Sequence, residues 1–558
     1  MKRALLLFFI IAMATSVVAQ NEWNYIWSLK ELPFNAYVND TTKTGSEMSI
    51  VKAGFDTDQD GWGEFFCAYS DQYPDNYILM YEATGDNTYE LVWYFQLPLP
   101  SNTFPQVAVG DIDNSGVVDI IVTMPSVVGT DPNPPRLWFF EWNGVQGENV
   151  YGRVNGEDLI PNSQWNFGVE DGYDFRPYSQ TIEDIDNDGK NELISGVRVA
   201  GSNNREVVVS SVNGSLTGFG SWQVEYRFSE SHGGSLYSAS TGDLDNDGNK
   251  EIYAMIWNNF TFRLFENTGD GQFETAVELD QIYQTEGIDY GALDGVVVAD
   301  VNNDGVNELY IAGTESTNQL FIITDITDVS QITAEDIKEF YTIPVVDQGK
   351  FRTMHLADPD NDGNLSLMIA GERNGQIFDL EYKGEGDPAN PANWEHQVIF
   401  DIWELSGIAQ GGITPRLFYG HPGGDMDNDG KDEYLFVNYS SDFSVWEDDA
   451  YVFMIEIDQV TGVATNTNLI PNNISLRQNY PNPFNPSTVI EFGLPEASNV
   501  KLVVYDMLGR EVTTLVNENL PAGTHLSNFD ASNLSAGTYF YTLSVGNKSE
   551  TNKMILLK

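Results

Sequence analysis

The chain has little cysteine, little positive charge and no sequence signature of an enzyme. Cys67 is the only cysteine among 558 residues, so no disulfide can form within the chain. Lys and Arg number 27 against 83 Asp and Glu, and the resulting net charge of −56 argues against nucleic acid or an anionic membrane as a partner. Nucleophile-elbow, HExxH, P-loop and dinucleotide-binding motifs are absent. We therefore expect a large acidic protein that is not stabilised by internal disulfides.

Long apolar runs are also missing, except at the start of the chain. Lys2 and Arg3 precede the apolar stretch ALLLFFIIAMATSVVA, which ends in the small residue Ala19. This pattern predicts a secretory signal peptide over residues 1–19, with cleavage after Ala19. No other stretch is long and apolar enough to span a bilayer, so no transmembrane segment is expected in the mature chain.

What the chain does have is one acidic nonapeptide in seven copies, called loops 1 to 7 here. Each has oxygen-bearing side chains at positions 1, 3 and 5 and a glycine at position 6, and six have an acid at position 9. Clustered oxygen ligands around a sharp turn suit a hard cation, so the motif predicts calcium. The loops start at Asp56, Asp111, Asp184, Asp243, Asp300, Asp358 and Asp425.

The loops also invite comparison with an EF-hand and with a simple solvated turn. An EF-hand needs a bidentate Glu at position 12, where the seven copies have Cys67, Val122, Ser195, Ala254, Ile311, Ile369 and Phe436. That excludes an EF-hand. A simple solvated turn also favours Asp, Asn and Gly. Seven copies with oxygens at set positions favour a cation over a turn alone.

The spacing of the loops predicts a repeat fold. Successive starts lie 55, 73, 59, 57, 58 and 67 residues apart, as expected for a supersecondary unit stacked on copies of itself. Strand-like runs flank each loop, so that the acid at position 9 opens a strand, and two further runs follow. Four strands per repeat and seven repeats predict an all-β fold, a seven-bladed β-propeller over residues 20–462.

Closure of this propeller is predicted to use the N-terminal segment. Only two convincing strands follow loop 7, whereas residues 23–33 resemble residues 89–98, an outermost strand of the first blade. We expect residues 23–29 to complete the last blade. The alternative is an N-terminal segment that packs elsewhere.

The loops and flanking strands resemble the FG-GAP and VCBS repeats of integrin-α-like propellers. The resemblance implies one calcium ion per loop, up to seven in all, and partner binding on the propeller faces. Ser115 at position 5 of loop 2 and Ser366 at position 9 of loop 6 depart from the pattern, so loops 2 and 6 are expected to bind most weakly, and loop 6 the most weakly of all. The implied ligands are Asp56, Asp58, Asp60, Glu64, Asp111, Asp113, Ser115, Asp119, Asp184, Asp186, Asp188, Glu192, Asp243, Asp245, Asp247, Glu251, Asp300, Asn302, Asp304, Glu308, Asp358, Asp360, Asp362, Asp425, Asp427, Asp429 and Glu433.

The C-terminal part is a separate unit. A linker is expected over residues 463–473, and short strands separated by turns predict a small β-sandwich over residues 474–558. The segments YPNPFNPST from Tyr480, YDMLGREV from Tyr505, LSAGTYFY from Leu534 and the terminal KMILLK closely resemble the C-terminal sorting domain of type IX secretion. The resemblance implies export by that machinery to the outer-membrane surface or the medium.

Three functions remain open at this stage. We expect a non-catalytic module that binds an extracellular glycan or protein, with no catalytic residue assigned. One alternative is a calcium-dependent polysaccharide lyase, for which His232, His355 and His421 could converge near the channel. Another is a structural spacer. For glycan binding, Trp62, Trp165, Trp222 and Trp394 are candidates for exposed aromatic residues.

Overall fold

The computed structural model divides the chain into two compact units, Met1–Val460 and Thr461–Lys558. It describes residues 22–458 except 33–47, 72–74, 99–104, 126–134, 156–157, 169–174, 201–203, 217–219, 232–234, 257–260, 270, 281–294, 314–317, 345–349, 373–374, 385, 414 and 442, and residues 475–556 except 477–478, 480–483, 485, 495–497, 508, 521–522, 532–533 and 547. The predicted signal peptide and linker lie outside these residues.

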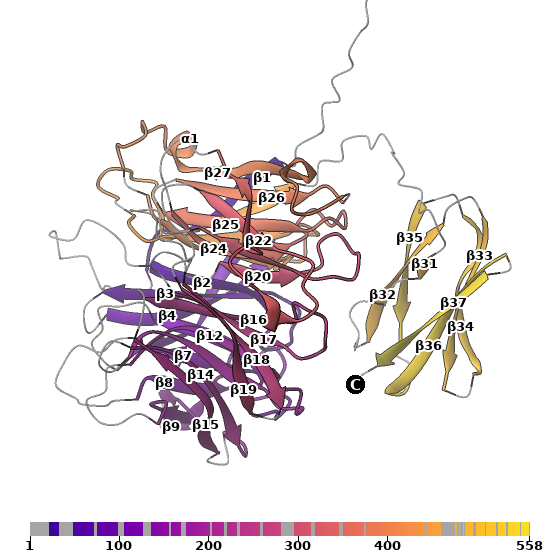
Figure 1. Cartoon of the computed structure of the whole chain (residues 1–558), viewed down its shortest axis with the longest axis horizontal. Coiled ribbons are helices and arrows are strands. Elements are labelled where there is room, and N and C mark those ends of the chain that lie inside the picture. Colours follow the sequence, from indigo (N-terminus) through magenta and orange to yellow (C-terminus); the bar gives the residue numbers. More distant parts are fainter. Residues whose placement is uncertain are drawn as a thin grey trace, which may run out of the picture. The chain divides into compact units, whose positions relative to one another are not determined.

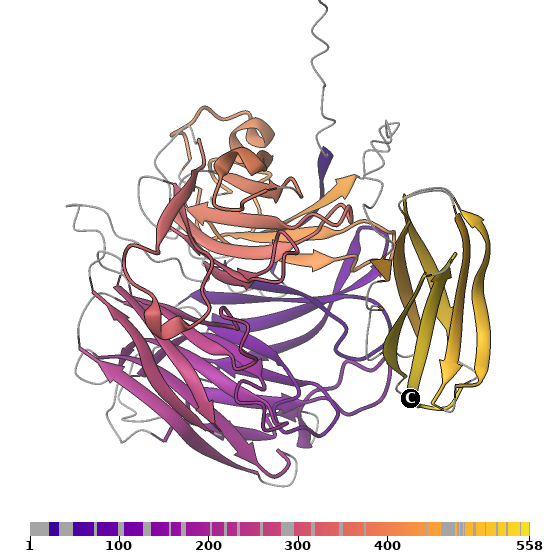
Figure 2. The same ribbon diagram turned by 45° about the vertical axis from the view of Figure 1, so that its right-hand side comes forward.

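The described part of the first unit is built from seven four-stranded antiparallel sheets, here numbered in chain order (Figures 1 and 2). Sheets 1 and 2 contain β2 (Met48–Phe55), β3 (Glu64–Asp71), β4 (Asp75–Gly85) and β5 (Thr88–Gln96), then β6 (Gln106–Gly110), β7 (Asp119–Thr123), β8 (Leu137–Glu141) and β11 (Ser163–Trp165). Sheets 3 and 4 contain β12 (Phe175–Glu183), β13 (Glu192–Ala200), β14 (Asn204–Asn213) and β15 (Ser221–Glu230), then β16 (Leu236–Gly242), β17 (Glu251–Ile256), β18 (Thr261–Gly269) and β19 (Gln272–Leu279).

The remaining sheets of this unit follow the same order. Sheets 5 and 6 contain β20 (Val296–Ala299), β21 (Glu308–Ala312), β22 (Gln319–Ile323) and β23 (Lys338–Thr342), then β24 (Lys350–Ala357), β25 (Ser366–Glu372), β26 (Gln376–Tyr382) and β27 (Trp394–Asp401). Sheet 7 contains β28 (Leu417–Gly424), β29 (Glu433–Asn438), β30 (Val452–Asp458) and β1 (Glu22–Leu29). Smaller elements are the hairpin β9 (Arg153–Asn155) and β10 (Asp158–Ile160), the short helix α1 (Ile402–Ser406) and the 3-10 turns η1 (Val329–Gln331) and η2 (Pro391–Asn393).

The N-terminal strand belongs to sheet 7. β1 pairs antiparallel with β30, and the pairing runs from Glu22 opposite Asp458 to Leu29 opposite Val452. The fourth strand of sheet 7 is therefore supplied by residues more than 420 positions earlier in the chain than its partner.

The first strands of the seven sheets contact one another in a ring. β2 contacts β6, β6 contacts β12, and the contacts continue through β16, β20, β24 and β28 back to β2. Neighbouring sheets also share hydrophobic cores, including those between sheets 6 and 7 and between sheets 7 and 1. The indigo strands of sheet 1 accordingly lie beside the orange strands of sheet 7 in Figures 1 and 2. The unit is all-β and propeller-like.

Burial along the strands follows from this stacking of sheets. β17 and β21, the second strands of sheets 4 and 5, are buried at every position, because neighbouring sheets cover both of their faces. The outermost strands β5 and β19 instead alternate between exposed and buried residues. Cys67 is fully buried in β3, and burial raises the pKa of its thiol above the ordinary value.

The second unit contains two antiparallel sheets around one hydrophobic core. The first sheet has the order β31 (Ser475–Leu476), β32 (Ser487–Leu494) and β35 (Gly523–Asp530), and the second has the order β34 (Glu511–Leu520), β33 (Ser498–Asp506), β36 (Gly537–Val545) and β37 (Lys548–Leu556). Phe492 and Phe529 of the first sheet and Leu502 and Tyr541 of the second belong to the same core. The second unit thus has its own hydrophobic core, separate from the cores of the first unit.

Candidate metal centres

Each acidic loop occupies the same place in its sheet. Loop 1 joins β2 to β3, loop 4 joins β16 to β17, and the other loops likewise join the first and second strands of sheets 2, 3, 5, 6 and 7. Position 9 is the first residue of the second strand in all seven sheets. The prediction that this position opens a strand is confirmed.

The seven loops also share one backbone conformation. Position 4 is left-handed in every copy, with φ between 55° and 62°, and position 6 is a glycine with φ between 88° and 94°. Asn is among the few non-glycine residues that adopt this region readily, and it stands at position 4 in six loops. The loop is therefore a defined turn that directs the side chains at positions 1, 3 and 5 to a common side.

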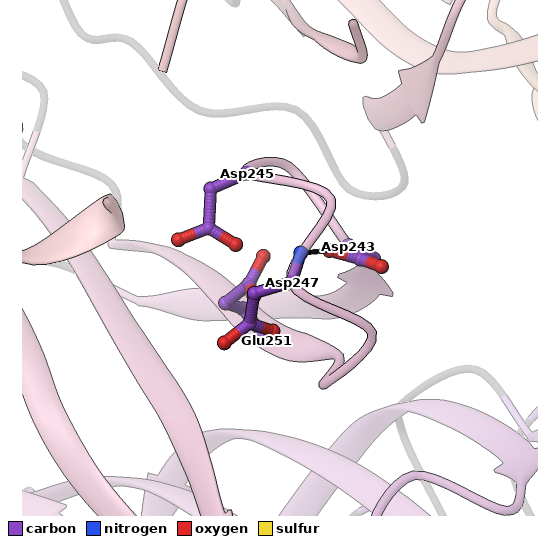
Figure 3. A group of neighbouring side chains, drawn as sticks. All are labelled: Asp243, Asp245, Asp247 and Glu251. Atoms are coloured by element: carbon purple, nitrogen blue, oxygen red, sulfur yellow. Dashed lines mark hydrogen bonds between the residues drawn. The ribbon is translucent and has the colours of Figure 1, made fainter. Parts of the chain in front are cut away.

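Loop 4 shows the arrangement most fully (Figure 3). Oxygen atoms of Asp243, Asp245, Asp247 and Glu251 all lie within 4.8 Å of one another. The backbone N–H of Asp247 donates to Asp243 Oδ1 at 3.1 Å, and the N–H of Gly248 donates to Asp243 Oδ2 at 3.1 Å. Four carboxylates face one small space, as a divalent cation requires.

The carboxylate at position 9 is buried and has a fixed role in six loops. One of its oxygens accepts the N–H of position 2, for example Leu244 to Glu251 at 2.9 Å and Met426 to Glu433 at 2.7 Å. The other loops with this bond are 1, 2, 3 and 5, at 2.8, 3.0, 3.2 and 3.2 Å. None of the six acids is more than 2% exposed.

In four loops the second oxygen of this carboxylate has no hydrogen-bond partner among the described residues. The unpartnered atoms are Glu64 Oε1, Asp119 Oδ1, Glu251 Oε1 and Glu433 Oε1. A solvated turn would give these oxygens water, whereas a buried carboxylate oxygen without a partner is costly. The residues present therefore fit a cation that binds the free oxygen.

Burial is also the main cause of raised pKa values at position 9. It raises the pKa of Glu64, Asp119 and Glu433 to about 9, of Glu192 and Glu251 to about 8, and of Glu308 to about 7. Nearby carboxylates of the same loop raise these pKa values further. Negative charge here needs either a proton or a cation.

The other predicted ligands are gathered to different degrees. Loop 7 matches loop 4, with Asp425, Asp427, Asp429 and Glu433 in one group, whereas loop 1 divides into one group of Asp56, Asp58 and Glu64 and a second of Asp58, Asp60 and Glu82. In loop 2, Ser115 donates its N–H to Asp111 Oδ1 and Asp113 Oδ1 at 2.9 and 3.1 Å. In loop 5, Asn302 Oδ1 accepts the N–H of Asp304 at 2.9 Å.

Loops 3 and 6 have additional features. The Lys190 ammonium pairs with Asp188 and is the main cause of that carboxyl's lowered pKa, while Asp184 accepts the N–H of Gly189 at 3.1 Å. In loop 6, Asp358 accepts the N–H groups of Asp362 and Gly363 at 3.1 and 3.0 Å. Burial, followed by the neighbouring Asp360 and Asp362, raises the pKa of Asp358 to about 6.

A second set of acids lies on the third strands, which the sequence analysis missed. In five sheets a glutamate stands directly opposite position 9: Glu82, Glu141, Glu266, Glu381 and Glu456. In four of these sheets position 9 is itself an acid, and like charges directly opposite each other destabilise a sheet unless something neutralises them. Hairpins of different length separate these glutamates from the loops, so only strand pairing reveals them.

Hydrogen bonds also link each of several loops to the following sheet. The Asn side chain at position 4 donates to the Gly carbonyl of the next loop, from Asn187 to Gly248, from Asn246 to Gly305 and from Asn428 to Gly61, at 3.0, 3.0 and 2.7 Å. Position 3 carboxylates accept N–H groups from turns of the next sheet, including Val329 to Asp245 and Asn87 to Asp427, at 3.0 and 2.6 Å. The loops therefore connect neighbouring sheets by hydrogen bonds.

The candidate histidines are only partly brought together. His355 of β24 and His421 of β28 lie with ring centroids 4.6 Å apart, and His232 lies outside the described residues. His421 Nδ1 lies 2.8 Å from the carbonyl oxygen of Pro422. His396 is on the outermost strand β27, where Nδ1 lies 2.9 Å from the Tyr341 hydroxyl.

The tryptophan candidates do not form an exposed platform. Trp165 and Trp222 stack on each other with centroids 5.2 Å apart, and Trp394 is only 3% exposed, so its predicted exposure is wrong. A cavity of about 470 Å³ instead lies between the outer strands of sheets 6 and 7. Its lining includes Trp23 and Tyr25 of β1 and the polar Asp401 and Glu404.

Family comparisons identify both parts of the chain. Residues 56–122 and 184–254 match a model of the FG-GAP-like repeat, and residues 478–557 match a model of the secretion system C-terminal sorting domain. The chain thus carries FG-GAP-like repeats and a type IX sorting domain, as the sequence predicts. That domain is the part that engages the secretion machinery, and it marks a protein exported to the cell surface or beyond. No described helix is long and apolar enough to cross a membrane.

The solved structures that match this chain are distant in sequence. PorZ, a surface component of the type-IX secretion system of Porphyromonas gingivalis, is 12% identical with a TM-score of 0.40; the alignment covers 91% of this chain but only 59% of PorZ. A fungal alcohol oxidase of the AA5 family is 10% identical (TM-score 0.42, covering 92% and 98%). The periplasmic gluconolactonase PpgL of Pseudomonas aeruginosa is 13% identical (TM-score 0.38, covering 86% and 99%). No curated protein matches the sequence.

The links between loops predict a measurable effect on stability. The Asn246 side chain donates a hydrogen bond to the Gly305 carbonyl and accepts one from the Asn307 side chain. Asn246→Gly removes both hydrogen bonds, and glycine still adopts the positive φ of this position readily. We expect the free energy of unfolding to fall by about 1–2 kcal/mol in urea titrations with calcium present. Asn361→Gly, at the same position of loop 6, is the control, because no hydrogen bond from its side chain occurs among the described residues. Equal losses in both variants would contradict the link.

The raised pKa values predict how pH affects the metal-free protein. Glutamate at position 9 has a pKa of about 7 to 9 in the folded protein, against an ordinary value of 4.5. Between these two pKa values the folded state therefore binds more protons than the unfolded state. Stability should therefore fall as pH rises from about 5 to 9. Calcium should abolish this fall by replacing the protons. Urea midpoints at several pH values would measure the fall in stability in chelator-treated protein and its absence in calcium-loaded protein. A metal-free stability that rises with pH would contradict the prediction.

Proposed function

We propose that the chain is an exported calcium-binding β-propeller of seven blades, which acts as a non-catalytic binding or adhesion module at the cell surface or in the medium. The observation that carries the calcium assignment is the buried carboxylate at position 9, whose second oxygen has no hydrogen-bond partner within the described part of the chain in four loops. Loops rich in carboxylates, with additional oxygens from neighbouring strands, suit the larger and more flexible coordination of calcium better than magnesium. All 27 ligands implied by the sequence remain part of this proposal.

The seven-bladed arrangement is supported by the ring of contacts among the first strands. It is also supported by the pairing of β1 with β30, which gives sheet 7 its fourth strand. In this proposal residues 20–462 form the propeller, with residues 23–29 in the last blade. Residues 1–19 are a cleaved signal peptide, residues 463–473 a linker, and residues 474–558 a sorting domain folded as a β-sandwich, supported by its shared core.

A glycan is the ligand class that we favour, and the cavity between sheets 6 and 7 is the candidate surface. It combines aromatic side chains, which can stack on apolar sugar faces, with carboxylates that can accept sugar hydroxyl groups. Tyr25 is 39% exposed there and its hydroxyl donates to Ser28 Oγ at 2.6 Å, which fixes the ring. A rigid exposed ring loses little conformational entropy on binding.

Calcium binding is tested by titrating the chelator-treated chain with calcium. We expect up to seven bound ions and a higher melting temperature, because cations bind the folded loops and not the unfolded chain. Magnesium at the same concentration should give a smaller rise. If the chain binds no calcium at millimolar calcium concentration, the proposal is wrong.

Ligand binding is tested with a glycan and polysaccharide screen, with and without calcium, that scores both retention and release of unsaturated sugar. We expect retention without product, and an affinity at least about tenfold lower for Tyr25→Ala, by loss of one stacking contact. Tyr94→Ala is the matched control, since Tyr94 is 54% exposed on β5, the outermost strand of sheet 1. Unsaturated product would favour the lyase alternative, and no retention of any glycan would reject the proposed ligand class.

A further inference from the structure

Loop 6 differs from the other loops at two linked positions. In the other six loops the acid at position 9 accepts the N–H of position 2. Loop 6 has Pro359 at position 2, which has no N–H, and Ser366 at position 9, which has no carboxylate. The hydrogen bond that the other six loops have in common therefore lacks both its donor and its acceptor in loop 6.

The same sheet has an acid where the other sheets have apolar residues. Asp379 of β26 pairs with Met368, two residues beyond Ser366, so both Asp379 and Ser366 face the same side of sheet 6. The equivalent third-strand residues of the other six sheets are all buried and apolar: Met80, Phe139, Val209, Leu264, Ile322 and Met454. The only acid at this position is in the only sheet that lacks one at position 9.

Asp379 is buried and lies beside loop 6. It is 3% exposed, and among the residues that the structure describes its Oδ1 has no hydrogen-bond partner. Burial raises the pKa of Asp379 to about 6, and the nearby Ser366 hydroxyl acts in the opposite direction. Burial is the main cause of the raised pKa of both Asp379 and Glu381, and the carboxylate of Asp360 in loop 6 raises both further. A carboxylate in a core position is costly unless it is neutralised.

We propose that Asp379 supplies the carboxylate that Ser366 cannot, so that loop 6 holds a divalent cation with Asp358, Asp360, Asp362 and Asp379. This inference rests on the proposed calcium binding by the loops. Ser366 then acts as a positioning residue, because its hydroxyl holds one oxygen of Asp379 and leaves Oδ1 for the ion. The ligand has moved from the second strand to the third, and the site is no longer the weakest of the seven.

The test counts bound calcium in the full chain by equilibrium dialysis and metal analysis. Asp379→Asn, which keeps the shape and an acceptor for Ser366, should lose one ion or weaken one site at least about tenfold, the lower limit for loss of a supporting residue. Glu251→Gln is the reference, because it removes the position 9 acid of loop 4 and should also lose one ion. An undiminished count in Asp379→Asn together with a loss in Glu251→Gln would overturn the inference but not the proposed function. No calcium in the unsubstituted chain would overturn both.

A second variant separates a cation ligand from a purely structural carboxylate. Asp379→Leu restores the kind of residue found in the other six sheets, so the metal-free protein should melt at the same or a higher temperature. The same variant should bind one ion fewer and gain less from calcium. If Asp379 only anchors Ser366, Asp379→Leu should instead melt lower without metal and keep the full ion count, which would overturn the inference.

Discussion

The buried carboxylate at position 9, present in six of the seven acidic loops, is the interaction on which this structure depends. It begins the second strand and accepts the N–H of position 2, which closes the turn. In four loops no described residue donates a hydrogen bond to its other oxygen. A buried negative charge of this kind must be neutralised by a proton or a cation. Local folding of the loop and binding of a cation are therefore linked at the same atoms.

The loops also connect this local requirement to the whole unit. Position 3 carboxylates and position 4 amides bond to the next sheet, so a loop that loses its conformation weakens the contact between two sheets. Each sheet is covered by neighbours on both faces and would expose its core alone. Stability is thus shared around the ring, and the pairing of β1 with β30 ties its two ends together.

Sheet 6 indicates how such a site can change without being lost. A carboxylate near the turn can come from either of two paired strands, since residues of both strands face the same side of the sheet. Pro359, Ser366 and Asp379 are consistent with one such exchange. The third-strand glutamates of five sheets indicate that acids on that strand are common around these loops.

The sequence by itself determined the repeat, the turns, the strand that follows each turn and the C-terminal sorting domain. These features depend on local patterns, because the oxygens at positions 1, 3 and 5, Gly at position 6 and alternating apolar residues act within a few residues of one another. Only the tertiary structure decided which acids on the third strands lie near the loops, such as Glu82 opposite Glu64 and Asp379 near Ser366. It also decided which residues line the cavity at Tyr25. The reason is that antiparallel pairing and closure join residues whose separation in the chain varies with hairpin length, so no fixed spacing in the sequence records them.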